Sequence, residues 1–458
     1  MYGINKDFNI HFIGVGGIGM SGIAEILLNL GYKVSGSDLN ENDNTQKLKH
    51  LGAQIFLGHK KENVQDAQLI VYSSAINPTN PEVVKATELR IPIIKRAEML
   101  AELMRLKFGI AVAGSHGKTT TTSFLSTILK ECQLNPTCIV GGIVKNLGGH
   151  ALKGDGDILV AEADESDGSF LFLNPIMSVI TNIDNDHLDY YKTVENLENS
   201  FLEFSHKVPF YGRVAINIED SKTKSLIKNL RRPHISYGLS DSADYYATQI
   251  QFDEQGSHFK LHHQDEIIDT TISLSGEHNI LNALGAIAIA HQLPLSLKQI
   301  CEGIAKFEGV GRRFEIIHSD KPVIVDDYGH HPTEIKSTLK TARQKYPDKN
   351  IVAIFEPHRF TRTQEHWDEF VASFSDISQV YIAPIYPASE EPIPNITSEN
   401  LIKDIQAKSQ NAAFLADWDE VLSIIDKASD NQTVIVSLGA GSISKIMRSK
   451  VETWSNKK

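Results

Sequence analysis

A short loop at residues 114–120 has the composition of a phosphate-binding site. Its sequence is G-S-H-G-K-T-T, and the backbone N–H groups of such a loop, with the helix that follows, form a cradle for anions. Lys118 can reach the β- and γ-phosphates of a nucleotide, and the Thr119 hydroxyl can bind Mg²⁺. The loop is a shortened variant, because Val112 stands where another glycine is usual. A plain glycine turn with a surface lysine is the alternative. The predicted ATP-binding residues are Gly114, Ser115, His116, Gly117, Lys118, Thr119 and Thr120.

A second glycine loop lies near the amino terminus. It has the pattern G-x-G-x-x-G directly after an apolar stretch, and an aspartate follows about 20 residues later, placed for a ribose hydroxyl. This pattern predicts a diphosphate at a helix N-terminus, which a redox dinucleotide or a UDP-sugar satisfies equally well. Close packing of a strand on a helix is the alternative without a ligand. The predicted substrate-binding residues here are Gly14, Gly16, Gly17, Gly19, Asp38 and Ser73.

Acidic residues gather after two further apolar stretches. Four of them lie within 161–167, and three more accompany His187 within 184–189. Like charges repel, so folding alone explains such clusters poorly, whereas a divalent cation with oxygen ligands resolves the conflict. Because the carboxyl ends of parallel strands share one crevice, we expect both clusters to meet the loop at 114–120 in one metal–phosphate site. A pair of solvated acidic turns is the alternative.

Arginine and histidine residues follow apolar stretches in the last third of the chain. His358, Arg359 and Arg362 form one such group, and arginine forks bind carboxylates with two parallel hydrogen bonds. We therefore predict that these three residues hold the carboxylate of an amino acid. Surface salt bridges are the alternative for each residue taken alone.

Parallel strands and helices are needed to position these motifs. The expected strands are 9–13, 34–36 and 69–72, then 108–113, 158–162 and 177–182, then 322–326, 350–355, 379–383 and 432–438. Alternating short strands over 244–274 indicate antiparallel additions to the second group. We predict an α/β fold of three domains, at about 150 residues per domain. They are a Rossmann-like domain at 1–106, a P-loop ATPase-like domain with added antiparallel strands at 107–310, and a Rossmann-like domain at 311–458.

The overall composition excludes several classes of protein. The net charge is −12, which disfavours a general nucleic-acid binder. Three cysteines without a C-x-x-C pair disfavour both a disulfide framework and a zinc–thiolate site. We expect a cytoplasmic protein without membrane contact, because the first residues lack a signal-peptide pattern and no apolar run reaches the about 20 residues of a membrane span.

Nine motifs, in order from about Gly14 to Ile443, resemble those of the Mur ligase family of peptidoglycan synthesis. They are G-V-G-G-I-G-M-S-G (14–22), G-S-H-G-K-T-T-T-T (114–122), A-E-A-D-E-S-D (161–167), T-N-I-D-N-D-H-L-D (181–189), G-E-H-N-I-L-N-A (276–283), G-R-R-F (311–314), D-D-Y-G-H-H-P-T-E (326–334), P-H-R-F-T-R-T (357–363) and G-A-G-S-I (439–443). The resemblance implies ATP-dependent ligation of an amino acid to UDP-N-acetylmuramate by a monomer or weak homodimer. The residues within these motifs are most similar to those of the family members that add L-alanine.

The resemblance also implies residue roles. Thr119, Glu162 and His187 would bind Mg²⁺, and Asn279 and Asn282 would contact ATP. Arg313 and Asp327 would come from the third domain and close on ATP, which Arg313 would bind. His358, Arg359 and Arg362 would face L-alanine. The implied catalytic residues are Lys118, Glu162, His187, Asn279, Arg313 and Asp327. One departure is Glu356, where the family commonly has glutamine; an added negative charge there would disfavour an acidic substrate.

Three other functions stay open on the sequence alone. Another Mur-type ligase, such as one that recycles a tripeptide onto UDP-N-acetylmuramate, shares most of the motifs. An NAD-dependent dehydrogenase fits the first glycine loop but leaves the loop at 114–120 and the acidic clusters without a task. An ATP-gated binding protein without chemistry predicts no phosphate release that depends on an amino acid.

Overall fold

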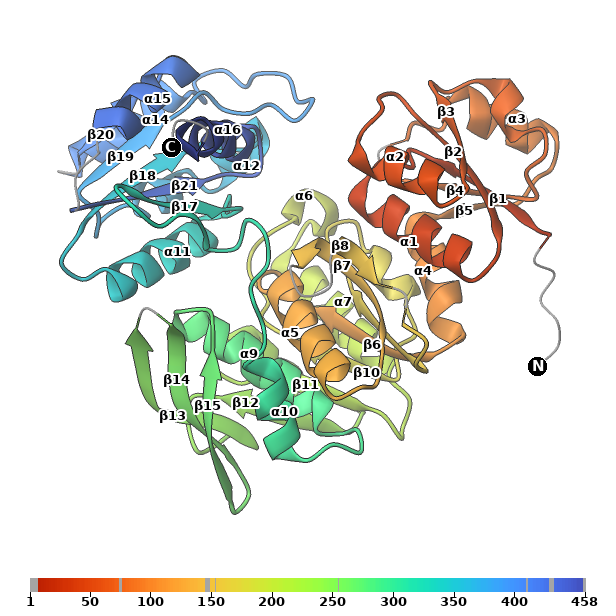
Figure 1. Ribbon diagram of the computed structural model, residues 1–458, viewed down its shortest axis with the longest axis horizontal. Helices are drawn as coiled ribbons and strands as arrows, with labels where there is room; N and C mark the ends of the chain where they lie inside the picture. Colours follow the sequence, from red (N-terminus) through yellow and green to blue (C-terminus); the bar gives the residue numbers. More distant parts are fainter. Residues whose placement is uncertain are drawn as a thin grey trace. The chain divides into compact units, whose positions relative to one another are not determined.

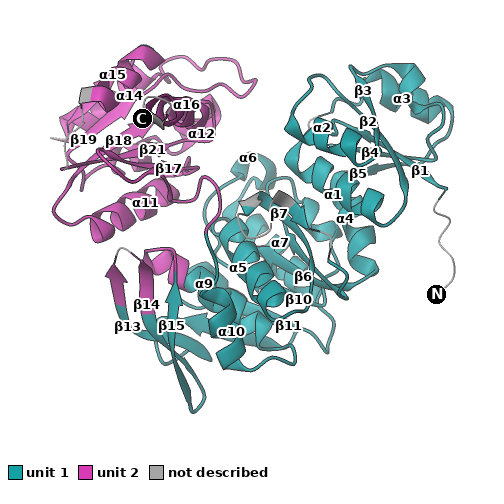
Figure 2. Ribbon diagram, viewed as in Figure 1, with its two compact units in different colours: residues 1–250, 259–272, 281–308 teal, residues 251–258, 273–280, 309–458 magenta. Residues whose placement is uncertain are grey.

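Three β-sheets with flanking helices make up the computed structural model (Figure 1). The structure describes residues 7–73, 76–144, 149–152, 154–253, 255–408, 411–427 and 432–455. The chain divides into two compact units (Figure 2). Unit 1 contains residues 1–250, 259–272 and 281–308, and unit 2 contains residues 251–258, 273–280 and 309–458. The predicted α/β fold is confirmed, with one sheet for each expected domain.

The first sheet lies in unit 1 and is parallel throughout, in the order β3-β2-β1-β4-β5. Its strands are β1 (Asn9–Ile13), β2 (Lys33–Asp38), β3 (Gln54–Leu57), β4 (Leu69–Tyr72) and β5 (Ile93–Lys95). Its helices are α1 (Ile18–Asn29), α2 (Asp43–His50), the 3-10 helix η1 (Lys61–Val64), α3 (Pro81–Glu88) and α4 (Arg96–Arg105). The strand order reverses between β1 and β4, and ligands of open parallel sheets bind beyond the strand ends at such a point.

The second sheet has ten strands in the order β15-β14-β13-β12-β11-β10-β6-β9-β7-β8. They are β6 (Phe108–Ala113), β7 (Thr137–Val144), β8 (Gly149–Leu152), β9 (Ile158–Glu162), β10 (Met177–Ile180), β11 (Arg213–Asn217), β12 (His234–Gly238), β13 (Tyr245–Asp253), β14 (Gly256–His263) and β15 (Glu266–Ile272). Strand β6 pairs in parallel with β10 on one side and β9 on the other. The motifs that follow these three strands therefore begin at one edge of the sheet.

Helices cover the second sheet, and its last strands follow the prediction. The helices are α5 (Lys118–Glu131), η3 (Ser169–Phe172), α6 (Leu188–Tyr191), α7 (Val194–His206), α8 (Ser221–Leu226), α9 (Glu277–Ala290) and α10 (Leu297–Ile304). Strands β13, β14 and β15 are neighbours joined by very short turns, which only antiparallel strands allow. The antiparallel pair of β7 and β8 was not predicted from the sequence.

The third sheet lies in unit 2, in the order β16-β17-β21-β18-β19-β20. Its strands are β16 (Glu315–His318), β17 (Val323–Asp327), β18 (Asn350–Phe355), β19 (Gln379–Ile382), β20 (Ala412–Phe414) and β21 (Thr433–Leu438). Its helices are α11 (Pro332–Lys345), α12 (Phe360–Glu365), α13 (Trp367–Val371), α14 (Ser398–Ala407), α15 (Trp418–Lys427) and α16 (Ile443–Ser455). All pairs are parallel except β16 with β17.

Apolar side chains alternate between the two faces of the third sheet. Val325 and Phe355 point into one core, and their neighbours Ile324 and Ile354 point into another on the opposite face. This alternation follows from strand geometry, in which successive side chains point to opposite sides. In unit 1 a single large core combines residues of the first sheet with residues of the second, and Gly22 of α1 packs closely against Ala151 of β8.

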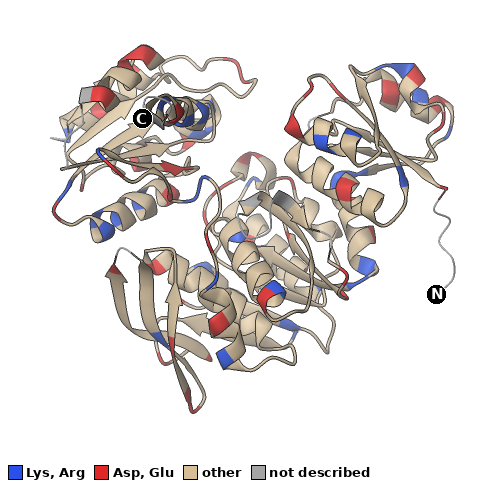
Figure 3. Cartoon of the chain, in the orientation of Figure 1, with Lys and Arg blue, Asp and Glu red and all other residues tan. Residues whose placement is uncertain are grey.

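Charged residues of both signs are distributed over both units (Figure 3). Among the described helices, none combines the length and the apolar character needed to cross a lipid bilayer.

Candidate active site

The loop between β6 and α5 requires glycine at two positions. Gly114 has a φ of 137° and Gly117 has a φ of 80°, both in the region that glycine adopts without strain. A Cβ atom on Gly114 would meet the Thr181 hydroxyl, and one on Gly117 would meet the side-chain amide of Asn282. The loop therefore lies against both neighbours with no space for a side chain.

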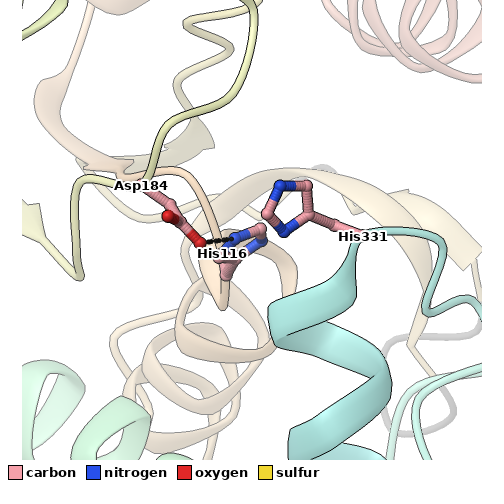
Figure 4. A group of neighbouring side chains, drawn as sticks. All are labelled: His116, Asp184 and His331. Atoms are coloured by element: carbon pink, nitrogen blue, oxygen red, sulfur yellow. Dashed lines mark hydrogen bonds and ion pairs between the residues drawn. The ribbon is translucent and has the colours of Figure 1, made fainter. Parts of the chain in front are cut away.

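Side chains that follow β10 hold the phosphate loop in shape. The His116 backbone N–H donates to Asn182 Oδ1 at 2.8 Å, and the Asp184 N–H donates to Ser115 Oγ at 2.8 Å. The His116 ring and Asp184 form a further contact of 3.0 Å between Nε2 and Oδ2 (Figure 4). A cradle that is fixed before a ligand arrives loses little conformational freedom on binding.

Lys118 begins α5 and lies inside a cluster of oxygen atoms. Its Nζ donates to the Gly114 carbonyl at 2.7 Å and to Glu165 Oε1 at 2.8 Å. Burial alone would lower the pKa of Lys118, but the carboxylates of Glu165, Asp164 and Glu162 outweigh burial and raise this pKa. Lys118 therefore carries a full positive charge at neutral pH, held against the carbonyls of Gly114 and Ser115.

Glu165 is the acidic residue closest to Lys118, and the sequence did not single it out from its cluster. Its side chain is 1% exposed. Burial raises the pKa of Glu165 to about 7, with Lys118 opposing the rise and Asp164 adding to it. Its Oε1 lies 3.7 Å from His187 Nε2, so the two acidic clusters meet here as predicted.

Thr119 and Glu162 meet on the other side of Lys118. The Thr119 hydroxyl donates to Glu162 Oε1 at 3.1 Å, and Glu162 Oε2 accepts from the Gly141 N–H at 2.8 Å. A hydroxyl and a carboxylate beside a phosphate loop are the hard oxygen donors that Mg²⁺ prefers, so these residues fit the expected ion. His187 lies instead beside Glu165 and Asp186. Within the described residues, no group of converging metal-ligand atoms combines Glu162 with His187.

Asp38, the aspartate that follows the glycine pattern, hydrogen-bonds to the amino-terminal glycine loop. The Gly16 N–H donates to Asp38 Oδ2 at 2.8 Å, so one oxygen of this carboxylate holds the loop. Gly14 has a φ of 80° and lies beside Ser73, which follows β4. Gly17 is the residue before the first turn of α1. The predicted substrate residues are thus brought together at the point where the strand order reverses.

Arg96 connects the substrate loop with the acidic cluster, and sequence reasoning missed it. Its Nη2 lies 3.5 Å from Asp164 Oδ2, and a Cβ on Gly19 would come within 2.8 Å of its Nη1. Together with Lys118, this guanidinium keeps the pKa of Asp164 below its usual value although burial would raise it. No local pattern in the sequence marks Arg96, because its ion pair joins a helix of the first sheet to a loop of the second.

The two predicted asparagines lie one turn apart on α9. Asn282 is buried and faces Gly117 of the phosphate loop. Asn279 is also buried, and its side-chain amide donates to the Ser275 carbonyl at 2.8 Å. The structure therefore places Asn282 directly at the loop.

In unit 2, Asp327 fixes backbone near Arg313. Its two oxygens accept from the N–H groups of Phe314 and Gly329, each at 2.7 Å. Burial raises the pKa of Asp327 to about 6, although Arg313 and these two N–H groups oppose the rise. Arg313 itself lies 3.4 Å from Glu334. Asp327 thus has a visible positioning task in addition to the catalytic role that the resemblance implied.

His358, Arg359 and Arg362 differ in their surroundings. Arg359 faces Glu390, with 3.9 Å between Nε and Oε1. Among the described residues Arg362 has no carboxylate partner, and its Nε is buried without a hydrogen bond. Burial, with the nearby charges of His330 and both arginines, lowers the pKa of His358 to about 4. His358 is therefore neutral at pH 7, and Arg362 Nη1 donates to the His358 carbonyl at 3.4 Å.

Glu356 does not extend its charge toward the predicted amino-acid site. Its side chain is buried and accepts from Ser442 Oγ at 2.6 Å and from the Ile443 N–H at 3.0 Å. Both groups belong to the N-terminal end of α16, where the helix dipole favours a negative charge. These two internal hydrogen bonds therefore weaken the expected effect of Glu356 against acidic substrates.

Comparison with family models divides the chain into three matched segments. Residues 9–108 match the model described as "Mur ligase family, catalytic domain". Residues 112–290 match "Mur ligase middle domain", and residues 312–441 match "Mur ligase, glutamate ligase domain".

Similar proteins cover nearly the whole chain. The UDP-N-acetylmuramate–L-alanine ligase of Geobacter sp. (strain M21) is 47% identical over 97% of this chain and 96% of that protein. The protein of the same name from Sulfurihydrogenibium sp. (strain YO3AOP1) is 44% identical over 95% and 96%. The crystal structure of UDP-N-acetylmuramate–alanine ligase from Thermotoga maritima is 29% identical, with a TM-score of 0.83 over 98% of this chain and all of that chain.

Proposed function

The chain belongs to the Mur ligase family, and from this premise we propose that it joins L-alanine to the carboxylate of UDP-N-acetylmuramate, with cleavage of ATP to ADP and phosphate. The observation that carries the proposal is the convergence of Lys118, Thr119, Glu162 and Glu165 on one glycine loop. Relatives with this activity in their names are 44 to 47% identical over almost the full length.

The proposed chemistry has two steps. The sugar carboxylate attacks the γ-phosphorus of ATP, which gives an acyl phosphate and ADP. The neutral amine of L-alanine then attacks the acyl carbon, the tetrahedral intermediate expels phosphate, and the amide product loses the amine proton. In the first step Lys118 and the loop N–H groups stabilise the charge on the transferring phosphoryl oxygens.

A magnesium ion fits this reaction as a charge-neutralising group on the triphosphate. Thr119 and Glu162 would hold it, and His187 would bind from the side of Glu165. Asn282 supports a nucleotide at this place because it lies against Gly117. The first glycine loop, with Asp38, Ser73 and its neighbours, would take the UDP part of the sugar nucleotide.

The amino acid would bind in unit 2. Arg362 supports this assignment, because its guanidinium has no carboxylate partner among the described residues and a ligand carboxylate would supply one. His358, neutral because its pKa is about 4, can accept a hydrogen bond from the ammonium group. We further propose that the protein works in the cytoplasm as a monomer or weak homodimer.

A phosphate-release assay tests the function. The protein is mixed with ATP, Mg²⁺ and UDP-N-acetylmuramate, and each of a panel of amino acids is added in turn. We expect release that depends on both the sugar nucleotide and L-alanine. Release without the sugar nucleotide, or none with any amino acid, would contradict the proposal, and a change in nicotinamide absorbance would point to a dehydrogenase.

A tripeptide-recycling ligase is the second candidate to compare. A murein peptide ligase from Psychrobacter arcticus shares the fold, with a TM-score of 0.71 at 24% identity. The higher identity of the alanine-adding relatives favours L-alanine. Adding L-alanyl-γ-D-glutamyl-meso-diaminopimelate to the same assay separates the two, because a recycling enzyme would use it faster than L-alanine.

A further inference from the structure

A second group of metal-ligand side chains, none of which has a role assigned above, lies in unit 2. His331, His366 and Glu369 each offer one ligand atom, and these atoms lie within 4.8 Å of one another. His331 and His366 are buried, whereas the side chain of Glu369 is 54% exposed. Neither the proposed chemistry nor the nucleotide and amino-acid sites use these three residues. We propose that they bind one divalent transition-metal ion of the Zn²⁺ class.

Two helix ends bring the three side chains together. His331 is the residue before α11, and His366 is the residue before α13. Glu369 follows His366 by three positions, a spacing that puts both side chains on the same face of a helical turn. His366 Nδ1 and Glu369 Oε2 are already 3.0 Å apart, a separation close to that of two ligands on one metal ion.

The two imidazole rings are in direct contact. Their centroids lie 4.5 Å apart with 75° between the ring planes. His366 Nε2 is buried and has no hydrogen-bond partner among the described residues. A buried polar nitrogen without a partner is costly, so the protein neighbours of this ring leave it incompletely satisfied.

The donor set selects the class of metal. Two imidazole nitrogens and one carboxylate oxygen suit Zn²⁺, Co²⁺ or Ni²⁺, whereas Mg²⁺ prefers oxygen ligands alone. Zn²⁺ bonds of about 2.0–2.2 Å place neighbouring tetrahedral ligands roughly 3.4 Å apart, so the group must contract by little more than about 1 Å. Glu369 can supply most of this movement because its side chain is exposed. Three protein ligands leave a fourth position for water.

An occupied site would tie the start of α11 to the start of α13. The turn before α11 carries His330, and the helix before α13 carries Arg362. A metal there would therefore hold together two segments next to the proposed amino-acid residues. Because a ligand that binds only the folded state stabilises it, Zn²⁺ should also raise the melting temperature.

Metal titration of the full-length protein tests the site. Co²⁺ serves as the visible probe and Zn²⁺ as the competitor, both in excess Mg²⁺ and without ATP. We expect one Co²⁺ per chain with visible absorption, displacement by one Zn²⁺, and a higher melting temperature with Zn²⁺. His366→Gln and Glu369→Gln should each weaken binding about 10-fold or more, a typical effect of disturbing a metal site.

The exposed His234 provides the matched control, because its replacement removes a histidine from unit 1 without touching the site. His234→Gln should bind Co²⁺ and Zn²⁺ as the unchanged protein does. Glu369→Gln alters an exposed side chain, so it remains informative even if His366→Gln fails to fold. The proposal is overturned if the unchanged protein binds no Zn²⁺ in excess Mg²⁺, or if Glu369→Gln binds it as tightly as the unchanged protein.

Discussion

Lys118 is the residue on which the proposed phosphoryl transfer most depends. Its ammonium group lies among three carboxylates and two loop carbonyls, so its charge is fixed in position before ATP binds. Lys118→Ala should reduce the rate of ADP formation by about two to three orders of magnitude, as is typical when a preorganised charge-stabilising group is removed. Lys130→Ala, at the far end of the same helix, is the control. ADP formation near the normal rate in Lys118→Ala would contradict the assignment.

Glu162 is predicted to act on the metal and not on the sugar or the amino acid. Glu162→Gln keeps the shape of the side chain but removes its charge, so the Mg²⁺ concentration for half-maximal activity should rise about 10-fold or more. The Michaelis constant for L-alanine should stay the same. An Mg²⁺ titration of phosphate release measures the effect, and Asp155→Asn provides a comparison at a different acidic residue. A titration curve that does not move would reject the ligand role.

His278 makes the stability of unit 2 depend on pH. Burial, with the nearby charge of Lys340, lowers its pKa from 6.5 to about 4. The folded state therefore keeps His278 neutral while the unfolded state takes up a proton below pH 6.5, so stability is full above pH 6.5 and falls as the pH drops toward 4. The loss is at most about 3 kcal/mol. His278→Gln should reduce the fall in melting temperature between pH 7 and pH 4.5, and an unchanged fall would show that other groups cause it.

At the scale of elements, the N-terminal end of α16 is stabilised by a side chain that follows a strand, β18. Glu356, which follows β18, accepts hydrogen bonds from Ser442 and from the Ile443 N–H. Glu356→Ala leaves both donors unsatisfied and should destabilise the protein by about 1–3 kcal/mol. Glu356→Gln, which retains an acceptor, should cost less. Thermal unfolding measures the difference, and Glu452→Ala at the exposed end of α16 is the control.

The amino-acid preference of these variants shows whether Glu356 acts as a helix cap or as a residue that determines substrate specificity. Because the Glu356 charge is directed at α16, Glu356→Gln should leave the ratio of rates with L-alanine and L-glutamate unchanged. A marked gain with L-glutamate would show that the charge acts on the substrate, as the sequence first suggested.

The sequence predicted several strands whose side chains are mostly apolar and buried, but it missed β11, which is equally buried. Strands β1, β4, β6, β9 and β18 have the predicted bounds. The strands β3 and β5 were missed because they are short and their side chains are partly exposed. The hairpin of β7 and β8 carries glycines at 141 and 142, which weaken any strand pattern.

The candidate site was predictable where its chemistry is local. The phosphate loop and the two acidic clusters could be placed together, because β6 was expected to lie in a parallel sheet with the strands that precede those clusters. The contact of Arg96 with Asp164 and the backbone contacts of Asp327 were not predictable. They depend on which loops a fold brings together, and residue type carries no signal of that.

At the scale of the whole molecule, the residues proposed to bind phosphate and those proposed to bind the amino acid lie in different compact units. Lys118, Glu162 and the first glycine loop lie in unit 1, whereas His358 and Arg362 lie in unit 2. The domains proposed from the sequence, residues 1–106, 107–310 and 311–458, assign the same residues to UDP-sugar, ATP and amino-acid binding. Acyl-phosphate formation and amine attack should therefore respond separately to substitutions of Lys118 and of Arg362.

Arg362→Ala tests this separation in the intact chain. Removing the guanidinium should raise the Michaelis constant for L-alanine by about 10-fold or more, since a charged hydrogen bond to the carboxylate contributes about 1.5–3 kcal/mol. Without L-alanine, the movement of an oxygen label out of the β,γ-bridge of ATP, driven by UDP-N-acetylmuramate, should continue at the normal rate because it reports only acyl-phosphate formation. Lys403→Ala, an exposed change on α14, should alter neither measurement. If Arg362→Ala abolished label movement as well, Arg362 would be needed for the first step, and its assignment to the amino acid alone would be wrong.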